Sequence, residues 1–264
     1  MPALVDIHCH LLPGIDDGAE DLATSLAMAR LAANDGTAAV IATPHQLGGF
    51  SGNRAEDIRR AVAALQRQLD ADGVPLTVLA GADVRIEEGL IQKLAEGEVL
   101  TLADRGRHVL LELPHDVCFP LAGLLRQLAG RGIAAILSHP ERNAGLQAQP
   151  RLVGELVDAG CLMQVTAGSY TGSFGPAAQR MAERLLAQGL VHFVASDGHG
   201  THSRRPLLGR ALARVAELAG DAAAFDLCCH HPAAVAAGAD VPAGRRVATM
   251  RARGWRGLFA RKAG

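Results

Sequence analysis

Two histidines and a carboxylate near the start of the chain have types and a spacing that suit metal binding. In the stretch "VDIHCHLLPGIDDGA", His8 and His10 follow a short apolar run, and Asp17 lies seven residues further on, in an Asp-Asp-Gly turn. Alternate side chains of an extended segment share one side, so Asp6, His8 and His10 point the same way. Imidazole and carboxylate groups brought together in this way are typical ligands of divalent metals.

Five further motifs place the same residue types at or directly after the ends of apolar runs. They are "ATPH", "GADVR", "LELPH", "SHPER" and "ASDGHG". With the first stretch they supply five histidines and four carboxylates, namely His8, His10, His45, His139, His199, Asp17, Asp83, Glu112 and Asp197. One tetrahedral zinc ion needs roughly three or four ligands, so this set is large enough for two or three metal ions that share carboxylates.

The chemistry of this set indicates phosphoryl transfer to water. Buried carboxylates without cations would be destabilised by desolvation and mutual repulsion, and divalent ions remove that destabilisation. Imidazole and carboxylate ligands suit Mn, Fe, Co or Zn, and neighbouring divalent ions hold phosphoryl oxygens and generate hydroxide near neutral pH. Arg142 and Arg204 each follow a candidate ligand by a few residues. An arginine binds a phosphate through two parallel hydrogen bonds, so both are candidate catalytic residues.

The elements that must position these residues alternate between strands and helices. Near-continuous apolar runs, expected to be buried parallel strands, lie at 3–7, 38–42, 76–80, 109–113, 133–137, 162–165 and 191–195. Helix-like segments lie at about 20–34, 54–71, 118–131, 149–160, 175–189 and 206–219. Seven such strands predict an α/β barrel that is complete or slightly broken. Active sites of these barrels lie at the C-terminal ends of the strands, where the candidate ligands would meet.

Length and charge predict one domain with a basic tail. The chain has 264 residues, which suits a single α/β barrel, and a formal net charge of −1. Residues 241–264 carry seven basic residues and no acidic one, which leaves 19 basic against 27 acidic residues before them. We therefore expect a domain at 1–240 and a tail at 241–264. The near-neutral total and the lack of a basic groove pattern argue against a nucleic-acid partner.

The same features bear on location. No apolar run approaches the roughly 18 residues of a membrane span, and an odd number of cysteines without a secretory signal predicts a cytoplasmic protein. The tail interleaves arginines with Trp255, Leu258 and Phe259. This pattern is typical of a segment that contacts an anionic membrane surface, in which case the protein would work at the inner face of the membrane. The alternative is a solvated, frayed end.

Two further groups of residues have open interpretations. The segment 166–175 is rich in Gly and Ser and is either a plain loop or a rim segment, with Tyr170 and Phe174 bordering an aromatic substrate. His115 lies near Glu112 in sequence and is an alternative pocket residue. Otherwise the histidines outside the candidate set are expected to have structural or surface roles; they are His108, His115, His192, His202, His230 and His231.

Six motifs in order resemble a known superfamily. "DIHCHLLPGIDDGA", "ATPH", "GADVRI", "LLELP", "SHPER" and "ASDGH" with a following arginine resemble the polymerase-and-histidinol-phosphatase (PHP) superfamily. Within it they resemble the bacterial metal-dependent protein-tyrosine phosphatases of capsule and exopolysaccharide operons, from about residue 4 to about residue 238. The resemblance implies a distorted (β/α)7 PHP-type barrel with a trinuclear metal site at the C-terminal ends of the strands. Manganese is the first expectation for its metals, with Fe, Co or Zn as alternatives.

The resemblance also implies a role for each candidate residue. The ligands of a first metal would be His8, His10 and Asp197, and those of a third would be Asp17, His45 and His199. A second metal would be bridged to the first by Asp83 and completed by Glu112 and His139. The phosphoryl group would be bound by Arg142 and by Arg204, which counting from His199 favours over Arg205. The family usually has Glu where Asp83 stands, so we expect a looser or water-mediated bridge.

The predicted reaction is hydrolysis of phosphotyrosine by a metal-bound hydroxide. No cysteine is followed by arginine in a Cys-x5-Arg loop, which disfavours a thiol nucleophile. The implied substrate is a tyrosine-phosphorylated protein, namely a membrane-bound tyrosine kinase of exopolysaccharide or capsule assembly. One alternative is a PHP-type phosphoesterase for a small phosphomonoester such as histidinol phosphate. Another is a metal-binding regulator without turnover, which the complete ligand set disfavours. The resemblance also makes a homo-oligomer plausible.

Overall fold

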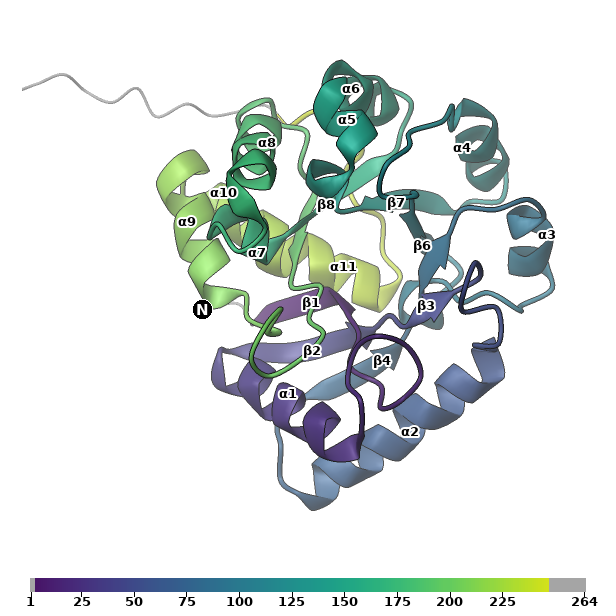
Figure 1. Cartoon of the computed structure of the whole chain (residues 1–264), viewed down its shortest axis with the longest axis vertical. Coiled ribbons are helices and arrows are strands. Elements are labelled where there is room, and N and C mark those ends of the chain that lie inside the picture. The colour runs from purple at the N-terminus through teal and green to yellow at the C-terminus, as the bar shows by residue number, and fades with distance from the viewer. Residues whose placement is uncertain (1–2, 247–264) are drawn as a thin grey trace, which may run out of the picture.

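The computed structural model describes residues 3–246, and the part of the expected tail from 247 to 264 lies outside the described residues. Its strands form two parallel sheets (Figure 1). The smaller sheet holds β1 (Leu4–Cys9), β2 (Thr37–Ala42) and β4 (Thr77–Ala80), in that order. The larger sheet contains, in order, β3 (His45–Gln46), β5 (Asp83–Arg85), β6 (His108–Glu112), β7 (Ala134–Ser138), β8 (Leu162–Thr166) and β9 (Phe193–Ala195).

The two sheets continue one another at both ends. Thr43 and Pro44 separate β2 from β3, and Gly81 and Ala82 separate β4 from β5, so each of these chain segments contributes a strand to both sheets. At the other end, an isolated parallel bridge joins Cys9 to Gly198, just after β9. The loops that follow the strands of both sheets therefore come together.

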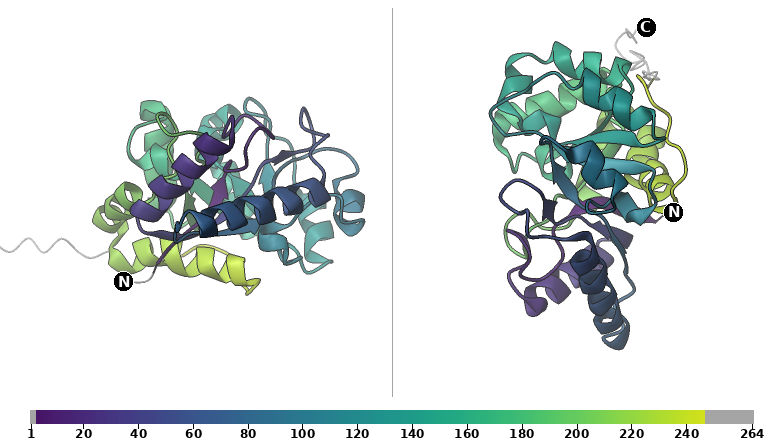
Figure 2. Two further views of the ribbon diagram at one scale, coloured as in Figure 1. Left: turned by 90° about the horizontal axis from the view of Figure 1, so that it is seen from below. Right: turned by 90° about the vertical axis from the view of Figure 1, so that its right-hand side faces the viewer.

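Helices pack around the strands. They are α1 (Leu22–Asn34), α2 (Ala55–Ala71), α3 (Leu90–Ala95), α4 (Ala122–Ala129), α5 (Ala144–Ala148), α6 (Arg151–Asp158), α7 (Ala167–Tyr170), α8 (Gly175–Ala187), α9 (Gly209–Ala219), α10 (Asp221–Phe225) and α11 (His231–Ala237). Shorter turns are η1 (Leu102–Asp104), η2 (Pro140–Arg142) and the π-helical η3 (Asp226–His230). Figure 2 shows α11 at the end of the molecule where the chain begins. None of the helices within residues 3–246 combines the length and apolar character that a bilayer crossing demands.

A small apolar cluster lies between the strands. Side chains from six strands meet there with Val235 of α11, which is fully buried; among them are Ile7, Ile41, Leu110, Ile136, Leu162 and Phe193. A second, larger cluster packs the outer faces of the strands against the helices. Strands buried on both faces carry apolar residues at almost every position, which is why their sequences read as continuous apolar runs.

All seven expected strands are present, and their ends differ from the predicted ends by at most two residues. The six expected helices are present too. The sequence patterns missed β3 and β5, which are too short to produce a pattern, and the short helices α3, α5, α7 and α10. The predicted wall role of Tyr170 is wrong, because its side chain is buried in the larger apolar cluster.

Residues 244–246 bind the outside of the domain. The Nε2 of His192 donates a hydrogen bond to the carbonyl oxygen of Gly244. Arg245 pairs with Asp158 of α6, and Arg246 pairs with Asp226 of η3. Part of the expected tail, residues 244–246, is therefore docked on the domain.

The buried Gln46 of β3 connects its strand to two neighbouring chain segments through hydrogen bonds. Its Oε1 accepts from the amide of Leu100, and its Nε2 donates to the carbonyls of Asn53 and Glu98. Gln46→Ala leaves these groups unpaired, so we expect a loss of about 2 kcal/mol of unfolding free energy. The melting temperature should fall by about 4–8 °C in thermal unfolding followed by circular dichroism with EDTA present.

The matched control is Gln68→Ala. Gln68 donates one hydrogen bond to Asp72 at the surface, so this variant should melt within about 2 °C of the wild type. Equal melting temperatures for all three proteins would contradict the assigned role of Gln46.

Candidate metal centre

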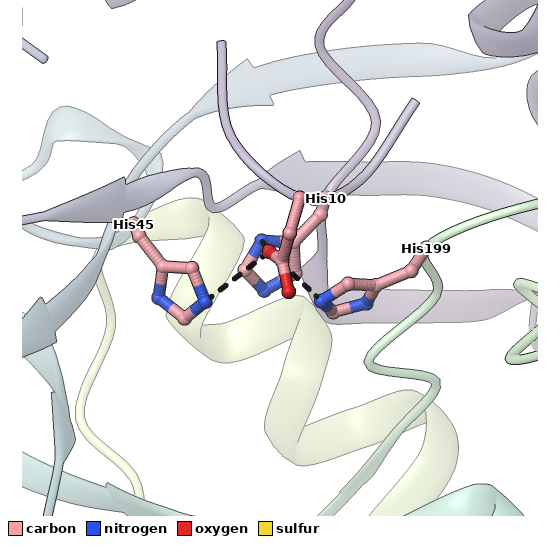
Figure 3. A group of neighbouring side chains, drawn as sticks. His10, His45 and His199 are labelled. Atoms are coloured by element: carbon pink, nitrogen blue, oxygen red, sulfur yellow. Dashed lines mark ion pairs between the residues drawn. The ribbon is translucent and has the colours of Figure 1, made fainter. Parts of the chain in front are cut away.

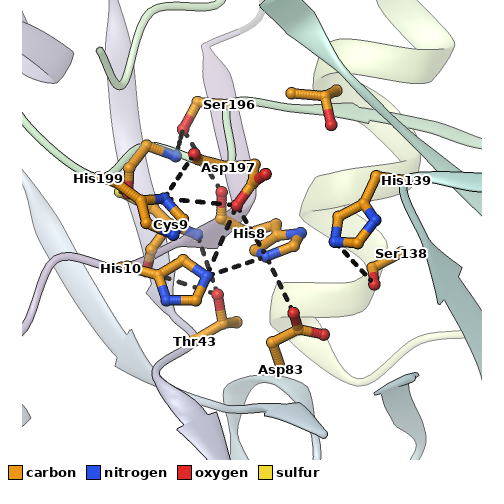
Figure 4. Close-up of polar contacts among 12 residues, drawn as sticks. His8, Cys9, His10, Thr43, Asp83, Ser138, His139, Ser196, Asp197 and His199 are labelled. Carbon is orange, nitrogen blue, oxygen red and sulfur yellow. Dashed lines mark hydrogen bonds and ion pairs between the residues drawn. The ribbon is translucent and has the colours of Figure 1, made fainter. Parts of the chain in front are cut away.

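The nine predicted ligands lie in one group of side chains near the ends of the strands. Figures 3 and 4 label seven of them, all except Asp17 and Glu112. Each has a nitrogen or oxygen within 4.0 Å of one in another member. They come from the ends of β1, β5, β6, β7 and β9, from β3, and from the loop before α1. The alternation of apolar runs and polar ends in the sequence correctly predicted this convergence.

The hydrogen bonds of three histidine rings fix which nitrogen faces the centre. Nδ1 of His8 lies 2.9 Å from Oε1 of Gln164, and Nδ1 of His10 lies 2.7 Å from Oδ2 of Asp16. Nδ1 of His199 lies 2.9 Å from the carbonyl oxygen of Asp197. Each partner is an acceptor, so Nδ1 carries the proton and donates it. With Nδ1 as the donor, the Nε2 atom of each ring is the one that can offer a lone pair to a metal at the centre.

The positions of these lone pairs fit a bound cation. Nε2 of His8 and Nε2 of His10 lie 3.2 Å apart. Oδ1 of Asp197 is 3.3 Å from the first and 3.6 Å from the second. Two lone pairs and a carboxylate oxygen this close repel one another unless a cation lies between them. The donor set of imidazole nitrogen and carboxylate oxygen suits a divalent transition metal.

Three groups of side chains are arranged closely enough to hold a metal. One consists of His8, His10 and Asp197, as the resemblance implied for a first metal. A second contains the expected third-metal ligands together with His10; its members are His10, Asp17, His45 and His199. A third group consists of His45, Asp83 and Glu112. His10 and His45 each belong to two groups, so the three groups adjoin.

His139 and His45 differ in how they meet Glu112. Nε2 of His139 lies 3.7 Å from Oε1 of Glu112, but His139 is not in the compact group around that carboxylate. His45 is in it, because its Nδ1 lies 3.6 Å from Oδ2 of Asp83 and 3.8 Å from Oε2 of Glu112. Its Nε2 lies 3.5 Å from Oδ1 of Asp17. One ring thus faces two groups of carboxylates.

Burial shifts the pKa values of His8, His139 and Asp83 in the directions that favour their neutral forms. Desolvation lowers the pKa of His8 to about 3 and holds the pKa of His139 well below its usual range. Desolvation, together with the charges of Glu112 and Asp197, raises the pKa of Asp83. Neither oxygen of Asp83 has a hydrogen-bond partner in the described chain. Neutral imidazoles and an uncompensated carboxylate are the groups that a cation would stabilise.

Asp197 stays charged and joins the centre to two arginines. Burial alone would raise its pKa, but the adjacent guanidiniums of Arg204 and Arg142 hold that pKa well below the usual range. Its Oδ2 accepts from Arg142 and, at 2.7 Å, from Nη2 of Arg204. Arg205 is exposed, so the geometry favours Arg204 as the counting of residues did. The backbones of His139, Asp197 and Arg204 are left-handed, with φ of 32°, 51° and 47°, a strain that functional sites often hold.

His115 approaches the centre, as its alternative interpretation required. Its ring stacks on that of His139, with centroids 6.0 Å apart and an interplanar angle of 24°, and its Nε2 is 4.0 Å from Oε1 of Glu112. Among the other histidines outside the predicted set, His108 and His192 are buried in the domain, and His230 is exposed.

Sequence reasoning missed the residues that orient the ligands. Asp16 and Gln164 fix two imidazoles, and Gly18 allows the Asp-Asp-Gly turn to close on His10, where a Cβ would lie 2.3 Å from the carbonyl oxygen. Gln164 could have been found as a polar residue inside an apolar run. Asp16 could have been found as the neighbour of a predicted ligand, but neither signal specifies the partner ring.

Comparison with known proteins gives consistent matches. The family model for capsular polysaccharide synthesis, CpsB/CapC, matches residues 4–237. The tyrosine-protein phosphatase YwqE of Bacillus subtilis is 39% identical over 202 residues, which cover 76% of this chain and 79% of that protein. The tyrosine-protein phosphatase CpsB of Streptococcus pneumoniae is 28% identical over 237 residues, 87% of this chain and 96% of that protein.

Solved structures agree with this similarity. A structure from a study of YwqE from Bacillus subtilis and CpsB from Streptococcus pneumoniae, described as metal-dependent tyrosine phosphatases, superposes with a TM-score of 0.88. It is 34% identical, and the match covers 91% of this chain and 97% of that chain. A phosphotriesterase homology protein from Escherichia coli shares the fold alone, with a TM-score of 0.54 and 12% identity over 88% of this chain and 97% of that chain.

The Asp16–His10 hydrogen bond provides a test of the metal centre. Asp16→Asn removes the charged acceptor that orients the His10 ring, and losses of this kind weaken metal affinity by about 10- to 100-fold. We expect that weakening for Mn²⁺ and Zn²⁺ in competition titrations with a chromogenic chelator. The isosteric control Asp21→Asn alters a surface helix cap and should bind metal as the wild type does. Unchanged affinity in Asp16→Asn would refute the orienting role.

Proposed function

This chain belongs to the CpsB/CapC family of capsular polysaccharide synthesis, and we propose that it is a metal-dependent protein-tyrosine phosphatase. Its substrate is a phosphotyrosine-bearing protein of capsule or exopolysaccharide assembly, namely the membrane-bound tyrosine kinase itself. The observation that carries the proposal is that the two carboxylate oxygens of Asp197 have different partners. Oδ1 faces the imidazole nitrogens, and Oδ2 accepts hydrogen bonds from two arginines. Metals and a phosphoryl group would thus meet across one carboxylate.

The residues present fit two or three divalent metals, of which manganese is the first choice. His8, His10 and Asp197 would hold the first metal, and Asp17, His45 and His199 would hold the third. Asp83 would link the first to the second, which Glu112 and His139 would complete, and the Nδ1 of His45 also faces Asp83. Bound there, the metals supply Lewis acidity toward the phosphoryl oxygens and an activated water near neutral pH.

Arg142 and Arg204 bind the phosphoryl group. Each guanidinium has five N–H groups, of which Nη1 of Arg142 and Nη2 of Arg204 donate to Asp197. The Nε of Arg204 is buried and has no hydrogen-bond partner in the described residues, so it suits a phosphoryl oxygen. Both arginines stabilise the charge that spreads over the equatorial oxygens in the transition state. A phenolate leaving group, with a pKa near ~10, needs less protonation than an alkoxide.

The cysteines support this route over a thiol nucleophile. Burial raises the pKa of all five thiols, that of Cys161 to about 12. A thiol with a raised pKa is a poor nucleophile at neutral pH, because the thiolate is the reactive form.

We further infer that the two sheets are parts of one distorted (β/α)7 barrel of the PHP type. The bridge from Cys9 to Gly198 and the apolar cluster enclosed by the strands support this arrangement. Residues 1–240 then form the phosphatase domain, and 241–264 form the basic tail. The enzyme works in the cytoplasm at the inner face of the membrane, where the tail contacts anionic lipid.

Phosphate release from a phosphotyrosyl peptide tests the reaction. The metal-loaded wild type should release phosphate, and EDTA should abolish it. Arg142→Ala should lower kcat/KM by at least about 100-fold, because it removes one of the two phosphoryl-binding guanidiniums, and it should retain metal, because Arg204 still pairs with Asp197. His139→Ala should lower both metal content and activity, whereas the surface control His230→Ala should leave both unchanged. Release from histidinol phosphate in place of the peptide would move the substrate to small phosphomonoesters, and release from neither would indicate a regulator.

Sedimentation with vesicles tests the tail. The intact chain should sediment with anionic vesicles and not with neutral ones, because each basic residue near an anionic surface contributes about 1 kcal/mol. A chain that ends after Arg246 keeps the docked segment and should lose this binding. Equal sedimentation of both chains would assign the binding to the domain and refute the tail proposal.

A further inference from the structure

An aromatic ring lies against both proposed phosphoryl-binding arginines. The guanidinium carbon of Arg142 is 4.3 Å from the centroid of the Phe174 ring, and that of Arg204 is 6.0 Å from it. Both distances lie within the range of cation–π attraction. Arg142 follows β7, Phe174 follows β8 and Arg204 follows β9. The ring therefore contacts side chains from two other segments of the chain.

The beginning of the segment 166–175, which carries Phe174, is bound to Glu141, the neighbour of Arg142. Glu141 is fully buried, and its Oε1 accepts from the amide of Thr166 at 3.0 Å and from the hydroxyl of Ser169 at 2.7 Å. Glu141 and Arg142 are consecutive in η2. The same turn therefore holds the beginning of the segment through Glu141 and receives its end through Phe174.

The ring also has a fixed place within its own segment. Gly168 of α7 lies so close to it that a Cβ there would be 2.7 Å from Cε2 of Phe174. The amide of Ser173 donates to the carbonyl oxygen of Gly168 at 2.9 Å, which closes the segment into a compact turn. Contact with Gly168 and with Arg142 thus fixes the orientation of the Phe174 ring.

An aromatic ring suits this position because it attracts a guanidinium without accepting the hydrogen bonds that a phosphate needs. Asp197 already takes one N–H from each arginine. A second carboxylate would occupy further N–H groups and reduce the positive charge toward the phosphoryl group, whereas the ring face leaves both intact.

We propose that Phe174 is a positioning residue for phosphoryl binding, which it supports by holding the Arg142 and Arg204 guanidiniums against Asp197. This inference rests on the proposed function, because it takes the two arginines as the phosphoryl-binding groups. It replaces the expectation that Phe174 borders the substrate with a role that acts through the arginines.

The test uses the metal-loaded full chain and inorganic phosphate as the probe. Phe174→Leu keeps apolar bulk and removes the aromatic face, so the Kd for phosphate by calorimetry should rise by about 3- to 30-fold. Phe174→Trp keeps the face and should stay within about 3-fold of the wild type. Metal content by mass spectrometry and melting temperature should be unchanged in both. The control Phe225→Leu alters an aromatic residue packed on the larger apolar cluster and should bind phosphate normally.

A mutant cycle with Arg142→Ala separates the possible failures. If Phe174 acts through Arg142, its replacement should add less to the Kd in the Arg142→Ala background than in the wild type. Wild-type affinity in Phe174→Leu, or a loss that follows lost metal, overturns the inference while the proposed function stands. Unchanged phosphate binding in both Arg142→Ala and Arg204→Ala overturns the proposed phosphoryl site and this inference with it.

Discussion

The buried carboxylate of Asp197 is the group on which the arrangement of the centre depends. Its Oδ1 faces the Nε2 atoms of His8 and His10, and its Oδ2 accepts from Arg142 and Arg204. Its position is set by strand pairing, since its amide donates to the carbonyl of His8 at 2.8 Å. A buried charge with cations on one side and imidazole lone pairs on the other is stable only if both sides stay in place. The loops after the first and last strands must therefore meet.

A second buried carboxylate holds those loops together. Asp6 accepts from the amide of Ser196 at 3.0 Å and from its hydroxyl at 2.5 Å, so the end of β9 is tied to β1 one residue before Asp197. Burial raises the pKa of Asp6 to about 6 although these hydrogen bonds oppose the shift. Asp6 shares the strand face of His8 and His10, but its work is structural. The alternation of side chains along β1 therefore orients His8 and His10 and also places Asp6, which holds the chain segment that carries Asp197.

The predictable part of the site was the part that strand topology determines. Residues such as His45 and Glu112 lie at or after apolar runs, and parallel strands bring such positions to one edge whatever the loops do. Asp16, Gln164 and Glu141 act through hydrogen bonds to particular atoms, and their partners depend on ring orientation rather than on order along the chain. The contacts of Tyr170 and Phe174 were likewise not predictable from their order along the chain. They lie four residues apart in one Gly-rich segment, yet the turn of α7 buries the first in the apolar cluster and places the second over Arg142.

The aspartate at position 83 can be understood from the geometry around it. Asp is one methylene shorter than the Glu usual in the resembling phosphatases, yet Oδ2 of Asp83 lies 3.5 Å from Nε2 of His8 and 3.6 Å from Nδ1 of His45. It therefore reaches both neighbouring groups of ligands. The His45 ring contributes to this, because its Nδ1 approaches Asp83 and Glu112 while its Nε2 stays near Asp17. Phe50 stacks on that ring, with centroids 5.1 Å apart, and stabilises this orientation. In the proposed enzyme, Asp83 and His45 would together connect the two groups of ligands, because the imidazole of His45 turns a nitrogen toward each of them.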